Sequence, residues 1–341
     1  MFHHRKGVLI RYSDNFVEAV TEVSPLPGFS SETFYEVISV IKDQHESLNS
    51  FFSKSYSPNE LKVFLKQLPN LPSLQFALSF LGLQILSNRN RQSLFELFDV
   101  SRSRKIRIND VLPIQDVDET IRHLKESYQK GFRTFKIKSG YPADNLIEIL
   151  EGINKTSIRD CKFRIDANQS WPAYKSSEII QSLEKFNIEY IEEPFQNYDL
   201  QALTNFEQTS SIPIALDESI QSTDHLKKLL QILPDTIFVI KPLILGNLFD
   251  LFETLAQYRT HFNRIVVTTA LESSIGRKAV ASVASLIGDQ AMAHGLNTGR
   301  FFKTDLSNDY PISNGSIEIP ETGFYATKIA DLNNSHYQSV D

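Results

Sequence analysis

The sequence predicts an α/β protein in which a β/α barrel follows a smaller α+β domain. From about residue 105 onward, short apolar or β-branched runs alternate with longer amphipathic stretches, as in parallel α/β folds. Eight candidate strands recur there about 25 residues apart, the size of one strand, one helix and two loops. No glycine-rich phosphate loop follows these strands, which favours a barrel over a doubly wound sheet.

The composition is that of a folded protein with a large core. The chain has 341 residues, of which 41% are hydrophobic and 11% aromatic, enough for one large core or two unequal ones. A net charge of −6 argues against a nucleic-acid surface, so we expect small-molecule partners. The single cysteine, Cys161, excludes an internal disulfide and fits a reducing cytoplasm.

The chain shows no sign of membrane contact or targeting. No apolar run approaches the roughly 18 residues that a membrane span needs, and the basic start is not followed by an apolar segment. We therefore expect a cytoplasmic location. These features leave the oligomeric state undetermined.

The first part of the chain is expected to contain one short strand and then mainly helices. The strand lies at Gly7 to Arg11. The first helix follows Pro27-Gly28 with Ser30 or Ser31 as its N-cap, and the second begins at Ser57-Pro58-Asn59-Glu60, a capping box with proline at the first helical position. The third runs from about Pro72 to Ser87 and is apolar nearly all round, so it should lie between two layers.

Charged residues end five consecutive strands of the predicted barrel. The eight candidate strands lie near Ile106 to Ile114, Arg133 to Lys138, Phe163 to Ala167, Ile188 to Glu193, Ile212 to Asp217, Ile237 to Pro242, Arg264 to Ala270 and Ala291 to Leu296. The second to sixth end in Lys138, Asp166, Glu192, Asp217 and Lys241. One such residue is usually a surface charge or a helix cap. Five at equivalent barrel heights should converge at the carboxyl ends of the strands, where barrel active sites lie.

The order base, acid, acid, acid, base indicates a particular chemistry. Three carboxylates brought together repel one another unless a cation lies between them. All-oxygen ligation selects a hard ion, Mg²⁺ or Mn²⁺, over zinc. A metal that binds a substrate carboxylate, flanked by two lysines, suits removal of the adjacent α-proton and stabilisation of the resulting enediolate.

The strand-end motifs resemble a known family. Lys136-Ile137-Lys138, Asp166-Ala167-Asn168, Ile191-Glu192-Glu193-Pro194, Asp217-Glu218-Ser219 and Ile240-Lys241-Pro242 are similar to motifs of the muconate-lactonising-enzyme subgroup of the enolase superfamily. The resemblance implies a (β/α)7β-type barrel over residues 105–305 and an α+β capping domain made of residues 1–104 and about 306–341. The segment at 22–30 resembles the mobile loop of that domain. Less sequence precedes the first strand than is usual in the family, so we expect different packing of the capping domain there.

The same resemblance implies residue roles. Lys138 would move the proton, Lys241 would face it across the enediolate, and Asp166, Glu192 and Asp217 would hold the metal. We expect Asn168, Glu193 and Glu218 to support the ligands, and we assign Lys136 and Gly28 to substrate binding. Arg164 either reaches the substrate or orients the site. Ser273 and Ser274 either receive a substrate carboxylate or cap a helix.

Further stretches resemble the o-succinylbenzoate synthases, hydro-lyases of menaquinone biosynthesis within this subgroup. They are SPLPGFSSET, FRIDANQSW, VIKPLILG, TTALESSIG and HGLNTG. Dipeptide epimerases and N-succinylamino-acid racemases carry nearly the same five site residues and remain alternatives. Epimerases resemble one another in an Asp-x-Asp near the eighth strand. The matching place here reads Gly295-Leu296-Asn297, which counts against an epimerase.

Overall fold

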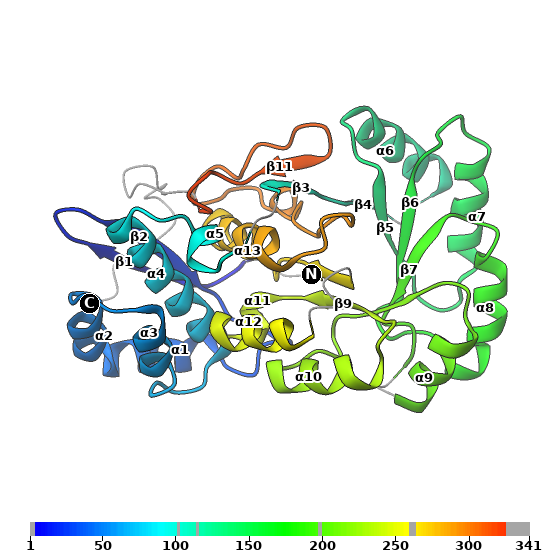
Figure 1. Cartoon of the computed structure of the whole chain (residues 1–341). Helices are drawn as coiled ribbons and strands as arrows, with labels where there is room; N and C mark the ends of the chain where they lie inside the picture. Colours follow the sequence, from blue (N-terminus) through cyan, green and yellow to red (C-terminus); the bar gives the residue numbers. More distant parts are fainter. Residues whose placement is uncertain (1–3, 101–102, 114–115, 197–199, 259–263, 325–341) are drawn as a thin grey trace.

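The computed structural model describes residues 4–100, 103–113, 116–196, 200–258 and 264–324. These residues form a curled parallel sheet covered by helices, beside a helical unit that carries a β-hairpin (Figure 1). The strands are β1 Val8–Ser13, β2 Glu18–Val23, β3 Lys105–Arg107, β4 Asp110–Leu112, β5 Thr134–Lys138, β6 Lys162–Asp166, β7 Ile188–Glu192, β8 Ile214–Leu216, β9 Ile237–Ile240, β10 Ile265–Val267 and β11 Ser316–Glu318.

The α-helices and 3₁₀ turns surround these strands. They are α1 Phe34–Asp43, α2 His45–Phe52, α3 Pro58–Leu65, α4 Pro72–Asn90, α5 Leu94–Leu97, α6 Val117–Gln129, α7 Asp144–Asn154, η1 Ala173–Lys175, α8 Ser176–Leu183, α9 Leu200–Thr209, α10 Thr223–Ile232, α11 Pro242–Leu245, α12 Leu248–Gln257, α13 Ser274–Ile287 and η3 Gly299–Phe301. Helices α6 to α9 lie outside β5 to β7 in Figure 1. In the described part of the chain, no helix is both long and apolar enough to cross a bilayer.

The barrel prediction is confirmed, with two changes at the seam between the two edge strands of the sheet, β4 and β10. Seven parallel strands follow the order β10-β9-β8-β7-β6-β5-β4. Within residues 264–324, the eighth candidate at 291–296 forms no strand. Its residues His294 and Gly295 instead make parallel bridges to Ile108 and Thr268, at the two edges of the sheet. The His294 Nδ1 atom also accepts the Val267 backbone N–H at 3.0 Å, so a side chain replaces a strand hydrogen bond there.

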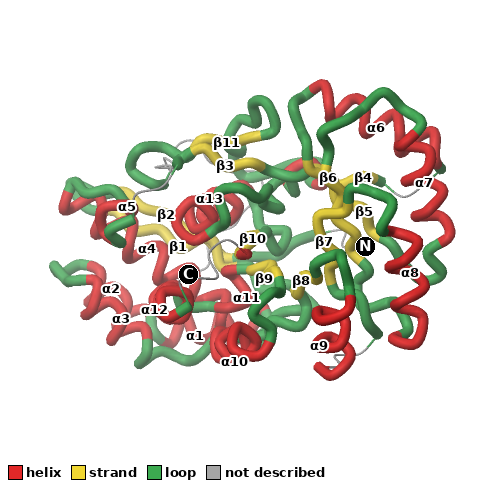
Figure 2. Tube along the Cα trace, turned by 45° about the vertical axis from the view of Figure 1, so that its right-hand side comes forward, coloured by secondary structure: helices red, strands yellow, loops and turns green. Residues whose placement is uncertain are grey.

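The first candidate strand of the barrel is two strands. β3 pairs antiparallel with β11, and only β4 joins β5 in the barrel. The predicted end of this candidate, Ile114, lies outside the described residues. Figure 2 shows β3 and β11 together beside α13, away from the β1–β2 hairpin. In the segment after residue 305, Thr322 O accepts the Leu94 N–H at 2.9 Å, and residues 325–341 lie outside the described residues.

The helical unit matches the expected helices in part. Ser57 and Glu60 form the predicted capping box at the start of α3. Helix α4 is buried at every position from Ser73 to Ser87, because it packs against β2 on one side and α11 and α12 on the other. Its placement between two layers is therefore confirmed. The N-cap of α1 is Thr33, not Ser30 or Ser31, which belong to the preceding turn.

Three short elements were not expected from the sequence: β2, α2 and α5. β2 lies buried against α4 although two of its six residues are glutamates, Glu18 and Glu22. Helix α2 follows α1 with only Gln44 between them.

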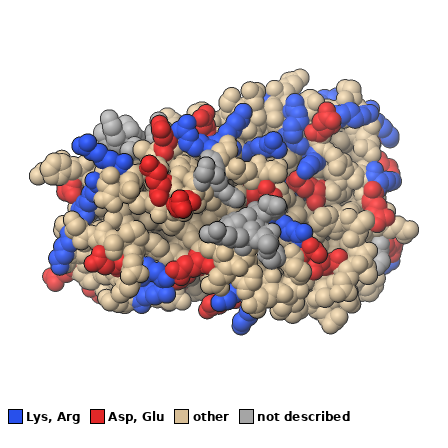
Figure 3. Space-filling model, viewed as in Figure 1, with Lys and Arg blue, Asp and Glu red and all other residues tan. Residues whose placement is uncertain are grey.

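On the face shown in Figure 3, acidic and basic side chains are interspersed.

Candidate active site

Strand register brings the predicted polar residues to one end of the barrel. Lys138 pairs with Asp166, and Asp166 pairs with Glu192. Asp217 and Lys241 each follow directly after a neighbouring strand, β8 and β9. Because all these strands are parallel, their carboxyl ends share one edge. The structure thus brings together the five residues that the sequence singled out.

Ion pairs connect these side chains. The Lys136 Nζ atom lies 2.9 Å from Asp166 Oδ2 and 2.9 Å from Glu192 Oε1. Lys241 contacts both carboxylate oxygens of Asp217. Lys138 lies 3.4 Å from Asp166 Oδ2, but its side chain is 59% exposed whereas that of Lys136 is 18% exposed. Of the two lysines on β5, Lys138 is therefore the one that an incoming molecule can reach.

The site is electrostatically crowded. Burial raises the pKa of Glu192 to about 8, and the charges of Asp166 and Asp217 add to this effect while Lys136 opposes it. Burial also disfavours the Lys136 ammonium, but Glu192 and Asp166 outweigh burial and raise the Lys136 pKa well above its ordinary value. Burial disfavours the Lys241 ammonium in the same way, and Asp217 reverses the direction, so that the Lys241 pKa is raised. The carboxylates are thus balanced by ammonium groups at close range.

The donor set has the chemistry of a hard-metal site. In the described ranges, no three His, Cys, Asp or Glu side chains are placed, as they stand, to hold one ion. Lys136 and Lys241 contact oxygens of all three carboxylates. Glu192 Oε2, however, is buried without a hydrogen-bond partner among the described residues. A buried carboxylate oxygen is costly to leave unpaired. Three carboxylates, one of them with an unpaired buried oxygen, are donors that fit Mg²⁺ or Mn²⁺ once the lysines move aside.

Glu193 accepts hydrogen bonds from the backbone of the loop that follows β8. Its Oε1 atom accepts the N–H groups of Asp217 at 2.8 Å and Ser219 at 2.7 Å, and its Oε2 accepts the Ser219 hydroxyl at 2.8 Å. Burial raises its pKa to about 7, while these hydrogen bonds oppose the shift. Glu193 therefore holds the loop that presents Asp217.

Asn168 links two neighbouring groups. Its Oδ1 atom accepts from Lys138 Nζ at 3.2 Å, and its Nδ2 donates to Glu218 Oε1 at 2.9 Å. Asn168 and Glu193 both have left-handed backbone, with φ of 44° and 43°. Such conformations are uncommon outside glycine and cluster at functional sites.

Two residues assigned to substrate binding lie deeper than expected. Arg164 is fully buried and donates to Glu189 at 2.7 Å and to Ala293 O at 2.6 Å, one layer below Asp166. The guanidinium donors of Arg164 thus point into the barrel interior. Of its two predicted roles, this placement favours orienting the site over reaching the substrate. Lys136 likewise bridges carboxylates rather than facing the opening.

The serines at the start of α13 already hold carboxylates of the protein. Ser273 is the N-cap, and its N–H donates to Glu22 Oε1 at 3.0 Å. The Ser274 N–H donates to Asp305 Oδ1 at 2.9 Å. The prediction that these serines bind a substrate carboxylate is thus corrected, because side chains from elsewhere in the chain occupy their donors. The helix-cap alternative holds.

The loop that contains Gly28 lies over the site. Gly28 has a φ of +80°, and no heavy atom lies within 4 Å of the place where a Cβ would be. It gives the turn its shape rather than a polar contact. The next residue, Phe29, places its ring centroid 5.6 Å from Lys241 Nζ and is 49% exposed. Phe29 is not among the predicted site residues, although it lies in the segment at 22–30 that resembles the mobile loop.

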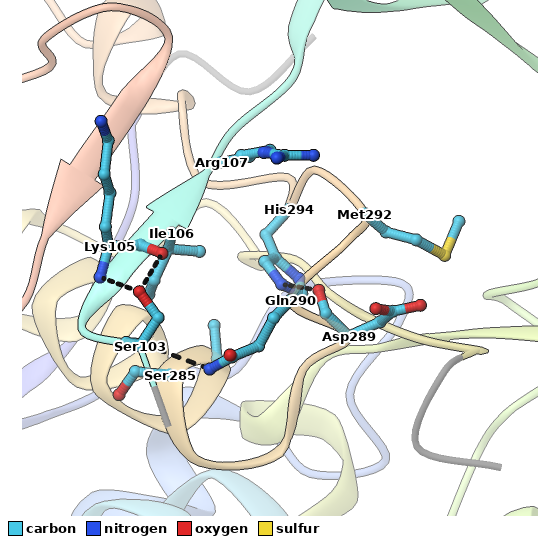
Figure 4. Close-up of a pocket in the computed structure, with 10 residues that line it drawn as sticks. Ser103, Lys105, Ile106, Arg107, Ser285, Asp289, Gln290, Met292 and His294 are labelled. Carbon is cyan, nitrogen blue, oxygen red and sulfur yellow. Dashed lines mark hydrogen bonds between the residues drawn. The ribbon is translucent and has the colours of Figure 1, made fainter. Parts of the chain in front are cut away.

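A small pocket at the opposite end of the barrel contains none of these residues. Figure 4 shows it between the segments before β4 and before the seam residue His294, with Ser103, Arg107, Asp289 and Gln290 around it. Because the barrel strands are parallel, this is their amino-terminal end. His294 is held there by a contact between its Nε2 and Asp289 O at 3.1 Å. The pocket is separate from the strand-end site.

Comparison with known proteins identifies the family. Residues 119–324 match the family described as enolase C-terminal domain-like. The chain is 35% identical over 106 residues to an L-Ala-D/L-Glu epimerase of Francisella tularensis subsp. novicida, covering 30% of each chain. It is 25% identical over 310 residues to an o-succinylbenzoate synthase of Aliivibrio fischeri, covering 90% of this chain and 86% of that protein. The matches to the epimerase above and to an L-amino acid-D/L-Glu epimerase of Francisella philomiragia span only 30% and 55% of those relatives' lengths.

Solved structures agree in fold. An o-succinylbenzoate synthase of Thermosynechococcus elongatus, complexed with Mg in the active site, is 26% identical with a TM-score of 0.67, covering 86% of this chain and 85% of that one. An N-succinyl Arg/Lys racemase of Bacillus cereus is 18% identical with a TM-score of 0.79, covering 96% and 88%. The second likeness concerns the fold alone.

Proposed function

Because the chain belongs to the enolase C-terminal domain-like family of the enolase superfamily, we propose that it is a hydro-lyase, an o-succinylbenzoate synthase of menaquinone biosynthesis in the cytoplasm. The reaction converts 2-succinyl-6-hydroxy-2,4-cyclohexadiene-1-carboxylate to o-succinylbenzoate and water. The observation that carries the proposal is the similarity to the o-succinylbenzoate synthase of Aliivibrio fischeri, which extends over 90% of this chain and 86% of that protein. The accessible Lys138 and Lys241, with three carboxylates at one barrel end, support the proton abstraction that this reaction needs.

The lysines supply the proton chemistry. Lys138 takes the proton from the carbon next to the substrate carboxylate. The same group then returns a proton to the leaving hydroxyl, so that water departs and the ring becomes aromatic. Lys241 remains an ammonium and faces the enediolate, where its charge stabilises the developing negative charge.

The carboxylates supply the metal site. Asp166, Glu192 and Asp217 would hold Mg²⁺, or Mn²⁺ in its place. A bound divalent ion of this kind stabilises negative charge on a substrate carboxylate. Asn168, Glu193 and Glu218 would orient these groups, in keeping with their contacts to Lys138 and to the backbone of Asp217.

The alternatives are an N-succinylamino acid racemase and a dipeptide epimerase, which share the proton-abstraction step. The identity of 35% over 106 residues to an epimerase supports epimerase activity as an alternative. Two features oppose epimerase activity. Gly295 offers no side chain, and Asn297 donates its amide to Asp110 Oδ1 at 2.9 Å. Neither position therefore presents a carboxylate to a substrate ammonium.

One experiment compares the three activities directly. The purified protein with Mg²⁺ is given the cyclohexadiene carboxylate, and formation of the aromatic product is followed by ultraviolet absorbance. In parallel, N-succinylamino acids and L-Ala-L-Glu are incubated in D₂O, and exchange of the α-proton is measured by NMR. We expect fast dehydration and slow exchange. Exchange without dehydration would overturn the proposal in favour of the substrate that exchanges.

A further inference from the structure

The guanidinium of Arg5 ties the loop over the site to the barrel. This group donates to Ser24 O at 2.7 Å and Pro25 O at 2.8 Å, at the start of the loop. It also donates to Leu271 O at 3.0 Å, just after β10. An arginine fork can bond several carbonyl oxygens at fixed angles. Arg5 therefore joins two segments that lie almost 250 residues apart in the chain.

A second contact fixes the strand that leads into the loop. Glu22, near the end of β2, is buried and accepts the backbone N–H groups of Ser273 at 3.0 Å and Gly276 at 3.0 Å. A carboxylate is favoured at a helix N-terminus. Glycine at position 276 leaves room for this approach, because a Cβ there would lie 3.0 Å from Glu22 Oε2 and 2.5 Å from the Cβ of Glu272. The hairpin is thus held against α13.

The far end of the loop is also anchored. Glu32 is buried, and its Oε1 accepts the Ser73 N–H at 2.7 Å, at the start of α4. Between the anchors the loop bonds to itself: Leu26 O accepts the N–H groups of Phe29 at 3.0 Å and Ser30 at 2.8 Å. With both ends held and a closed turn between them, the position of Phe29 over Lys241 depends on the anchors.

We propose that Arg5 is a positioning residue for the active site, which holds the loop at 25–30 against the barrel so that Phe29 covers Lys241. The expected effect on substrate rests on the proposed function. The attachment of the loop to the barrel through Arg5 does not, because it is a property of the fold. Without Arg5, its two hydrogen bonds to carbonyl groups at the start of the loop and its two to carbonyl groups after β10 are lost. The loop should then open more often and hold substrate less well.

The test compares Arg5→Met with a matched variant, Arg89→Met. Arg89 makes a similar set of contacts within the helical unit: it donates to Lys54 O at 2.6 Å and Phe52 O at 2.9 Å and pairs with Asp14 at 3.2 Å. Both substitutions remove a guanidinium that bonds backbone carbonyls. Only Arg5→Met touches the loop.

The first readout does not depend on activity. Amide hydrogen exchange of Phe29 and Ser30 should be roughly tenfold faster in Arg5→Met and unchanged in Arg89→Met, since exchange follows local opening. Equal exchange rates of these two amides in Arg5→Met and the unchanged protein would overturn the proposal that Arg5 holds the loop. If the unchanged protein shows neither dehydration nor proton exchange, the proposed function fails while this result still stands.

The second readout is kinetic. We expect Arg5→Met to raise KM roughly tenfold and to change kcat by less than about threefold, because uniform binding is lost. Arg5→Lys should recover part of the effect, since one ammonium cannot bond both segments as the fork does. Arg89→Met should lower thermal stability with KM unchanged. If both variants lower stability and neither moves KM, Arg5 has a structural role only.

Discussion

Lys136 Nζ lies 2.9 Å from Glu192 Oε1 in the interior of the barrel, where the Glu192 side chain is only 1% exposed. The same ammonium reaches Asp166 at 2.9 Å. One lysine thus balances two carboxylates that would otherwise be buried side by side. This pairing explains how the site is stable before any cation is bound.

Removal of that lysine should therefore cost stability. We expect Lys136→Met to lose roughly 3–5 kcal/mol in urea denaturation without metal, because it removes the ion-pair partner of buried Glu192 and the closer of the two lysines beside Asp166. Added Mg²⁺ should restore part of the loss. The control is Lys185→Met, which breaks an exposed pair with Glu151 and should cost less than about 1 kcal/mol. Similar losses in the two variants would contradict the pairing.

Lys138 should be the proton-transfer group. Lys138→Ala should lower kcat for dehydration by roughly 10²–10⁴-fold, the usual contribution of a positioned acid or base, with thermal stability nearly unchanged because its side chain is 59% exposed. Lys175→Ala, which removes another exposed lysine paired with Glu178, should keep full activity. Substantial turnover in Lys138→Ala would show that another group is the base.

Activity should depend on a hard divalent ion. After treatment with a chelator, dehydration should stop, and Mg²⁺ or Mn²⁺ should restore it, whereas Zn²⁺ should not, since the proposed donors are oxygens alone. Asp217→Asn should weaken Mg²⁺ binding at least tenfold in calorimetry while the protein stays folded. Asp235→Asn, at an exposed pair with Arg264, is the control. Full activity in chelator would exclude the proposed role of the three carboxylates.

Stability should fall as pH rises from about 4.5 to about 7 because of Glu272. Burial raises the pKa of Glu272 to about 7 from an ordinary 4.5, so the folded protein holds a proton that the unfolded chain has lost. Its contribution is complete below about pH 4.5 and disappears as pH passes 7, a change of roughly 3 kcal/mol.

Glu272→Gln should remove this dependence. Relative to the unchanged protein, the variant should become steadily more stable between pH 5 and pH 8 in urea denaturation. Glu318→Gln, at a side chain that is 71% exposed, should run parallel to the unchanged protein. A constant difference between Glu272→Gln and the unchanged protein would mean that Glu272 titrates normally.

Sequence reasoning was strongest where a local pattern carries the information. Ser57 and Glu60 lie within one helical turn, so their capping box is readable from four residues. The all-round apolar pattern of α4 likewise indicates burial on every side. It was weakest for β2 and for the barrel seam, where pairing with distant segments decides the conformation.

The sequence by itself determined the barrel and the five strand-end residues, because strand spacing and parallel direction force Lys138, Asp166, Glu192, Asp217 and Lys241 to one edge. Only the tertiary structure decided which neighbours those residues meet. Arg164 donates to Ala293 O inside the barrel, and the Ser273 N–H at the start of α13 donates to Glu22. Arg5 donates to Leu271 O. These contacts join segments up to 266 positions apart. Periodicity specifies the direction of a side chain along its own strand, and packing alone specifies what lies opposite.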